Sequence, residues 1–478
     1  MLRNFDMDAT PAMPRSNQAK RSLLDSTLIG AVLLLLPMLP LFLDTTRNRD
    51  WGVGLFVLLI GLLTALWSFS QLGKTGAHNR VWRSAAPMIF LLVATQAWVA
   101  FQYFVSLSTD TGATLQSLVL GTAYSLLFIL ICGLFHTRKR LTLLISALLV
   151  SATLQAFYGS LMTLTGIEWQ VVAQKEVGQG NATGTFYNRN HLAGYLEMTL
   201  GLGIGLLLAF RDGADFRWRN LLELLMGPKA RIRLALVIMV IALVMTRSRM
   251  GNTGFVSSLV VVGAIYILIN KTNRKRNAIL LASFIAIDVL IISQFFGLEK
   301  LADRLVNTQF ENQVEISVGD DGAVVERIIK RENVQRDDVL VYALPAIKER
   351  WMAGWGAGSF WGSFQQFTGP DVYLDYDHAH NDYVEFLYEY GAVGFLALGL
   401  FVLLALYNAL RALWNLNSWY RSGIGFGSSM AIVAILVHSS TDFNLQIPAN
   451  AATFIVVCAI AVLANTHRKV KTKTQEFR

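Results

Sequence analysis

Long apolar runs separated by short polar turns dominate this chain. Three of the runs, 51–70, 86–105 and 253–270, contain no charged residue at all. A helix of about twenty residues crosses the roughly 30 Å hydrocarbon core of a bilayer. The pattern therefore predicts an all-α polytopic membrane protein with about twelve transmembrane helices.

The polar breaks set the limits of the expected spans. The apolar run of the first span is long and has no small-residue cleavage site before its polar turn, so we do not interpret it as a cleavable signal. We place the spans near 24–43, 51–70, 86–105, 115–135, 141–165, 191–210, 232–246, 253–270, 277–296, 383–408, 424–441 and 449–465.

These spans divide the chain into five parts. One large loop separates the ninth and tenth helices, and its polar, aromatic-rich sequence indicates a folded segment. The expected parts are a disordered cytoplasmic tail at 1–22, spans one to nine at 23–296, a large periplasmic loop at 297–382, spans ten to twelve at 383–466 and a basic cytoplasmic tail at 467–478.

The basic residues lie unevenly along the chain. The protein has 41 Lys and Arg residues and a net charge of +9; if the N-terminus is cytoplasmic, 27 of them fall in inside segments and 6 in short outside loops. This asymmetry follows the positive-inside rule and predicts cytoplasmic termini and a periplasmic large loop. The charge thus orients the chain among membrane lipids, and we expect no nucleic-acid partner.

The large loop contains local signals for structure. Residues 314–318 and 323–328 flank a Gly-Asp-Asp-Gly turn and predict a hairpin. A helix is expected over 334–351, bent or interrupted by Pro345. The two cysteines, Cys132 and Cys458, fall within spans and are expected to be buried.

Polar motifs gather at the predicted outer face. They occupy residues 184–191, 246–251, 375–383 and 440–444, which come from four different loops. Their candidate supporting residues are Asn188, Asn190, His191, His378, Asn381 and Asp442.

Arginines in outside loops are the most informative of these residues. Arg189, Arg247 and Arg249 are disfavoured there by the positive-inside rule. The arginine fork matches phosphate oxygens, so the three residues predict an anionic ligand at headgroup depth, with Arg336 of the large loop as a fourth member. The alternative is that these side chains only reach toward lipid headgroups.

His380 is the strongest candidate for a proton acceptor at this face, and Asp382 or Glu385 is expected to orient it. The alternative is a purely structural histidine. The run from Asp375 through Asp377 and His378 also has metal-ligand spacing. We expect no metal, because the nucleotide sugars that such motifs bind are cytoplasmic.

Two acids lie within apolar spans, and charges in spans are functional candidates. Glu197 is close to the predicted interface, where water would solvate it, and Asp288 has no evident partner. Both keep a transporter of lipid-linked sugars as an alternative. A non-catalytic scaffold is the other alternative, although it would have no need for His380.

The motifs resemble those of the O-antigen ligase and polymerase superfamily of bacterial envelopes. The similarity covers most of the chain from about residue 115. It is carried by Gly184–Gly194, Ser248–Gly251, Gly354–Phe360, His380–Gly391 and Asp442–Ala449.

The resemblance implies a metal-independent, cofactor-free glycosyltransferase of the bacterial inner membrane with a periplasmic active site. Its donor would be a glycan on undecaprenyl diphosphate, and its acceptor lipid A core or a growing polysaccharide. The family's histidine falls on His380 and its arginines on Arg249 and Arg336. We expect the ligase type, with a polymerase as the alternative, His380 and Asp382 as catalytic residues, and the arginines as diphosphate ligands.

Overall fold

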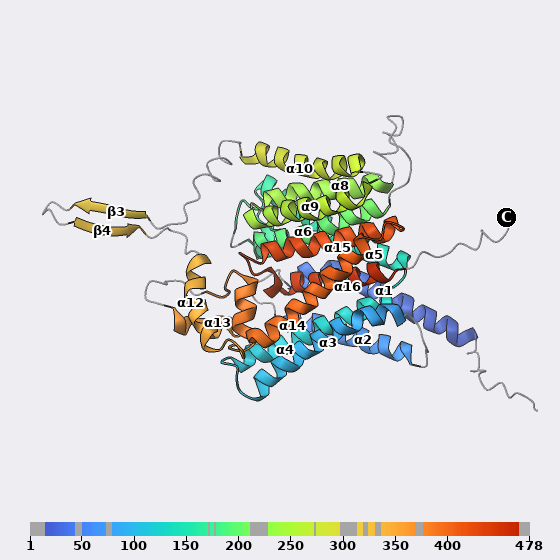
Figure 1. The fold of residues 1–478 in the computed structure, drawn as a ribbon, viewed down its shortest axis with the longest axis horizontal. Helices are drawn as coiled ribbons and strands as arrows, with labels where there is room; N and C mark the ends of the chain where they lie inside the picture. Colours follow the sequence, from blue (N-terminus) through green and yellow to red (C-terminus); the bar gives the residue numbers. More distant parts are fainter. Residues whose placement is uncertain are drawn as a thin grey trace, which may run out of the picture.

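The computed structural model describes most of the chain. Within the described residues the protein is an all-α bundle of long helices that run side by side (Figure 1). Ten of these helices are long and apolar enough to cross a membrane. The predicted fold class is therefore confirmed. The described residues are 15–43, 50–72, 79–170, 173–175, 178–210, 228–271, 274–296, 313–318, 324–329, 336–368 and 376–467.

Every predicted span overlaps a helix. The helix α1 begins at Arg15, so residues 15–22, which were expected to be disordered, are helical. The helices α8 and α10 occupy the places of predicted spans but are not among the ten. The bundle comprises α1 (Arg15–Leu43), α2 (Asp50–Gln71), α3 (Asn79–Phe104), α4 (Thr111–Leu134), α5 (Arg138–Thr165), α6 (Arg189–Ala209), α8 (Pro228–Met245), α9 (Arg249–Ile269), α10 (Arg274–Phe296), α14 (Asp382–Leu413), α15 (Trp419–His438) and α16 (Pro448–Thr466).

The helix α6 forms the centre of the bundle and is wholly buried along its span. It packs closely on α15 through glycines spaced four residues apart, Gly201 and Gly205 on α6 and Gly423 and Gly427 on α15. A Cβ on Gly205 would lie only 2.5 Å from the carbonyl oxygen of Gly423. Small residues at this spacing let two membrane helices approach until their backbones touch.

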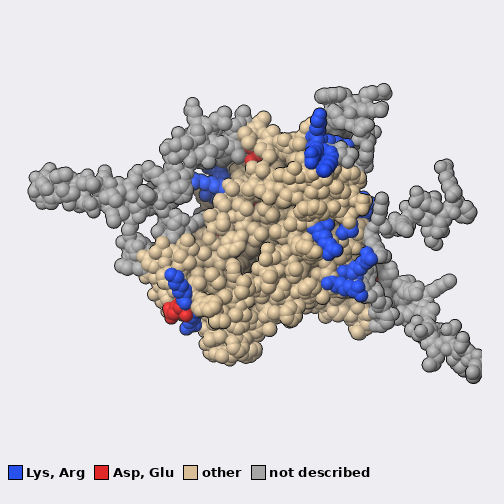
Figure 2. All heavy atoms as spheres, in the orientation of Figure 1, with Lys and Arg blue, Asp and Glu red and all other residues tan. Residues whose placement is uncertain are grey.

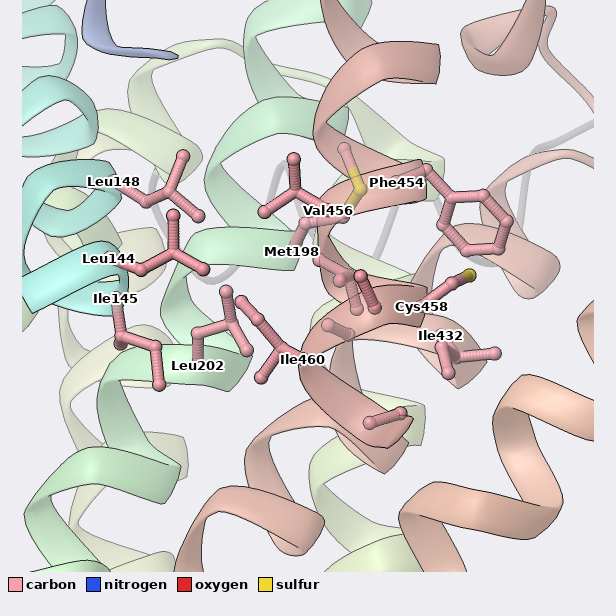
Figure 3. Packing of buried hydrophobic residues seen from close by; sticks show 14 of the residues in the cluster. Leu144, Ile145, Leu148, Met198, Leu202, Ile432, Phe454, Val456, Cys458 and Ile460 are labelled. Atoms are coloured by element: carbon pink, nitrogen blue, oxygen red, sulfur yellow. The ribbon is translucent and has the colours of Figure 1, made fainter. Parts of the chain in front are cut away.

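Apolar side chains from four helices fill the space around α6 (Figure 3). Leu148 of α5, Met198 and Leu202 of α6, Ile432 of α15 and Phe454 of α16 belong to this core. Cys132 and Cys458 are also buried within helices, as predicted.

The chain outside the bundle contains short elements at one end (Figure 1). Strands β3 (Gln313–Val318) and β4 (Val324–Ile329) pair antiparallel, with Val314 opposite Ile328, which confirms the hairpin. Pro345 lies inside α12 (Arg336–Glu349) and does not end it. The remaining elements are β1 (Trp169–Gln170), β2 (Ala173–Gln174), α13 (Phe360–Phe364) and the 3-10 helices η3 (Gln365–Phe367) and η4 (Asn444–Gln446).

A small second core joins the end of the large loop to the beginning of α14. Trp355, Phe360 and Phe364 pack on Tyr388, one helix turn before α14 breaks at Gly391, whose φ is 60°. The break lets the N–H of Ala392 donate to the carbonyl oxygen of Trp351 at 2.7 Å. This docking fixes the first turns of α14 relative to the bundle.

The two ends of the bundle differ in content. Both described chain ends, α1 and α16, have their outermost residues at one end, and the large loop lies at the other (Figure 1). Figure 2 shows several groups of Lys and Arg at the end near the termini. Following the predicted orientation, we call the end with the large loop the outer end and the opposite one the inner end.

Candidate functional site

Hydrogen bonds join the chain segments that carry the polar motifs at the outer end. The side chain of Asn450 donates to the carbonyl oxygen of His191 at 3.0 Å, which joins α16 to α6. The N–H of Ala182 donates to the carbonyl oxygen of Met245, which joins the loop before α6 to α8. The N–H of Asp382 donates to Ser439, which joins α14 to the turn after α15.

Phe443, in the turn between α15 and α16, holds three histidines around its ring. The ring of His378 stacks on it with centroids 4.2 Å apart. His380 and His191 meet it edge-on at 4.9 and 5.2 Å. We call Phe443 with these three residues the histidine cluster; it brings together all three histidines that the sequence singled out.

Glu385 fixes the protonation of His378. Its Oε1 lies 2.7 Å from Nδ1 of His378, and its Oε2 accepts from the N–H of Ala379. Burial alone would lower the pKa of His378, but the charge and hydrogen bond of Glu385 outweigh it and raise the pKa to about 9. His378 is therefore a cation at neutral pH.

His380 stands in an unusual backbone conformation. Its φ is 50°, and Arg247 has a φ of 55°. Among the described residues other than glycine, only Ser106 shares this left-handed region. The conformation costs about 1–2 kcal/mol for a residue with a Cβ. Such strain collects at functional sites, where the surrounding structure imposes it.

Asp382 ties α14 to the turn that carries Phe443. The carboxylate is buried and accepts from the hydroxyl of Ser439 at 2.6 Å and from the N–H of Leu445 at 3.1 Å. Asp382 and Glu385 were the two carboxylates expected to orient His380. In the structure Asp382 bonds to Ser439 and Leu445, and Glu385 bonds to His378 and Ala379. Asp382 thereby sets the position of the histidine cluster.

Four helices begin at this site, and predicted polar residues cap two of them. Asn188 caps α6 by accepting from the N–H of Asn190, a buried residue. Asn381 caps α14 through the N–H groups of Tyr383 and Val384 and donates to Ser440. Helices α9 and α16 begin at Arg249 and Pro448 beside them. Helix N-termini carry partial positive charge, so their convergence favours an anion.

Two of the predicted arginines flank the α8–α9 turn. Arg247 and Arg249 are exposed, on either side of the buried cap Ser248. The first turn of α9 lies against α6, since a Cβ on Gly251 would be 2.6 Å from that of Ala193. The turn is therefore a neighbour of the helix that carries His191.

The other two arginines are placed less fully. Arg189 begins α6 and donates to the side chain of Asn181 at 3.2 Å. Arg336 begins α12, but its side chain lies outside the described residues, as does Asp375. Within the described part of the chain, no group of three His, Cys, Asp or Glu side chains is arranged to hold a metal ion.

A buried charged group beneath the cluster was missed by the sequence reasoning. His438, the last residue of α15, places Nδ1 3.0 Å from Oε1 of Glu197 and Nε2 3.7 Å from Oδ2 of Asp442. All three side chains are almost completely buried, so the expectation that water solvates Glu197 is wrong. The available signal was an acid four residues after His438, although α15 ends at His438 and Asp442 lies in the turn that follows. Asp288, the other acid in a span, is also buried.

The comparisons with known proteins agree with this geometry. Residues 234–399 match a family model described as O-Antigen ligase. The matched segment runs from α8 into α14 and includes Arg247, Arg249, His378, His380 and Asp382. No curated protein matches the chain.

The match supports glycan transfer of the O-antigen ligase or polymerase type at the family level. It also agrees with a bundle of apolar helices that are able to cross a membrane. Residues 234–399, from α8 into α14, are thus similar to the O-antigen ligase family.

Proposed function

We propose that the chain transfers a glycan from undecaprenyl diphosphate to a hydroxyl of lipid A core, as a metal-independent and cofactor-free ligase. The reaction would occur at the outer end, on the periplasmic face of the bacterial inner membrane. The observation that carries this proposal is the histidine cluster at the outer end, together with the α8–α9 turn, which carries Arg247 and Arg249 and packs on the helix of His191.

In the proposed reaction, the acceptor oxygen attacks the anomeric carbon of the first sugar. The bond between that carbon and the diphosphate oxygen breaks, and its electron pair leaves with undecaprenyl diphosphate. The guanidinium groups of Arg247 and Arg249 stabilise the charge that grows on the leaving group. A single displacement of this kind inverts the anomeric centre.

His380 is proposed to take the acceptor proton. A neutral imidazole suits this role near neutral pH. The neighbouring His378 does not suit it, because its pKa of about 9 keeps it protonated beside Glu385. Asp382 is proposed as a positioning residue, since its bonds to Ser439 and Leu445 hold the turn that carries Phe443.

The distribution of outer cations favours the ligase over the polymerase. A polymerase handles two carrier diphosphates and needs a second set of cations. Four further cations of the large loop, Lys330, Arg331, Lys348 and Arg350, are the candidates for such a set. Lys348 is exposed on α12. Arg350 lies 4.0 Å over the Trp355 ring and donates to the carbonyl oxygen of Leu107. Lys330 and Arg331 lie outside the described residues. Arg350 therefore supports the fold of the loop.

Replacement of His380 tests the proposal. We expect His380→Ala to lower glycan transfer about 10²–10⁴-fold, the usual contribution of a general base, with normal membrane insertion. His136→Ala removes a histidine at the inner end, beside Gly133, and serves as the matched control. Transfer by purified protein from a carrier-linked glycan to lipid A core is the measurement. Unchanged transfer by His380→Ala contradicts the role.

A deletion strain separates the two transfer types. For a ligase, long glycans accumulate on the carrier and are missing from lipopolysaccharide. If single repeat units accumulate on the carrier or on the core instead, the protein is a polymerase.

A further inference from the structure

A pocket of about 630 Å³ opens at the inner end, far along the bundle from the histidine cluster. Arg80 at the start of α3, Arg411 near the end of α14 and Arg421 at the start of α15 line it. Arg83 and His467 complete its charged and titratable lining, and none of the described lining residues is acidic.

The polar floor of the pocket is built by a chain of hydrogen bonds. Arg421 donates to both the carbonyl and the side-chain oxygen of Asn465. Asn465 donates to the side chain of Asn408 at 2.7 Å, and Ser84 donates to the same oxygen at 2.7 Å. The Nε of Arg421 is buried and has no hydrogen-bond partner among the described residues. The guanidinium is thus held in place by its bonds to Asn465.

The charge of the pocket affects the histidine at its edge. Burial, together with the positive charges of Arg138 and Arg421, lowers the pKa of His467. The contribution of the two arginines indicates a positive potential at this edge of the pocket, which an anion would relieve. Arginine forks with unused donors are well suited to phosphate oxygens.

The surroundings of the pocket indicate the depth at which it lies. Trp414, which follows α14, and Trp419, which begins α15, are exposed beside it. Exposed tryptophans at helix ends are typical of the membrane–water interface. We propose that this pocket binds the phosphate headgroup of an anionic lipid from the leaflet at the inner end. Basic pockets between membrane helices on the cytoplasmic side are suited to such headgroups.

Charge removal inside and outside the pocket tests the proposal. The pocket variant is the double substitution Arg80→Gln with Arg411→Gln, which leaves the half-buried Arg421 untouched. The matched control is Lys275→Gln with Arg276→Gln, which removes two exposed charges from α10 at the same end. Delipidated protein is titrated with short-chain phosphatidylglycerol, and bound lipid is counted by native mass spectrometry. Thermal unfolding verifies that both variants remain folded.

We expect the pocket variant to bind phosphatidylglycerol at least about tenfold more weakly, because it removes two of the cations that attract an anionic headgroup. The control should stay near the parent value. Equal losses in the two variants, or no loss in the pocket variant, overturn the proposal. Phosphatidylcholine should not replace phosphatidylglycerol. Inorganic phosphate that binds as tightly as phosphatidylglycerol would assign the pocket to a free anion instead of a lipid.

Discussion

The histidine cluster and the helix layer beneath it each contain a histidine paired with a glutamate, and the two pairs differ in exposure. His378 and Glu385 lie 2.7 Å apart, with 25% of the His378 side chain exposed. His438 and Glu197 lie 3.0 Å apart, and both side chains are 0% exposed. Six helical residues, about 9 Å, separate Glu197 from His191 of the cluster.

The setting decides what each pair contributes. A pair near solvent exchanges protons with the medium and is partly screened. A fully desolvated pair is different, because the loss of one member leaves an uncompensated charge in a medium that cannot solvate it. The His378–Glu385 pair can therefore change its protonation with the pH. The His438–Glu197 pair instead holds α6 and α15 together.

The largest expected effect is the loss of the buried pair. Glu197→Ala or His438→Ala should destabilise the protein by about 3–5 kcal/mol, because each leaves its partner buried without its counter-charge. The measurement is thermal unfolding of the purified protein in detergent. The double variant should be less destabilised than the sum of the singles. Strictly additive losses would mean that the pair is not coupled.

An exposed glutamate supplies the control for this series. Glu349 lies at the end of α12, where its side chain is exposed. Glu349→Ala should leave the unfolding temperature close to that of the parent, since single surface substitutions change stability by roughly 0.5 kcal/mol or less.

The two pairs also show which features of the fold could be predicted from the sequence and which could not. The spans and the hairpin were predictable because apolar runs and turn residues are local signals. The pairing of Glu197 with His438 was not, because it depends on which helices touch. The glycines at 201, 205, 423 and 427 contained that information, since matching small-residue spacings indicate close helix packing.

The site was predictable in its members but not in its arrangement. Sequence motifs named His191, His378 and His380, yet the ring of Phe443 that gathers them became visible only in the fold. The break of α14 at Gly391 was also hidden. It depends on a contact with Trp351, about forty residues earlier, which no local pattern encodes.

The next largest effect concerns the arginines of the α8–α9 turn. Arg249→Ala should lower glycan transfer about 10²–10³-fold, the usual result of removing one fixed donor to a developing charge. Arg249→Lys should also be impaired, because a point charge does not replace the planar fork. The same transfer assay from a carrier-linked glycan measures both.

A control variant at a second cation of the outer end tests whether Arg249 acts on the diphosphate itself or only adds to the general attraction of an anionic substrate. Lys348 is exposed on α12, away from the α8–α9 turn. Lys348→Ala should leave transfer near the parent value. Equal losses in Arg249→Ala and Lys348→Ala would show that only the overall charge of the outer end matters.

The smallest expected effect is the change in stability with pH that comes from the His378–Glu385 pair. The pKa of His378 in the folded protein is raised from 6.5 to about 9 through Glu385, against the effect of burial. A raised pKa means that the charged form stabilises the fold, so this stabilisation is complete below about pH 6.5 and is lost as the pH rises through about 9. Because the ring is partly exposed, we expect a contribution of about 1–2 kcal/mol.

The measurement is the difference in thermal stability between the parent and His378→Gln, followed from pH 6.5 to pH 10. It should be largest at the acidic end and shrink toward zero at the alkaline end. A difference that stays constant or grows with pH would mean that Glu385 does not hold His378 as a cation, and it would remove the argument that separates His378 from His380.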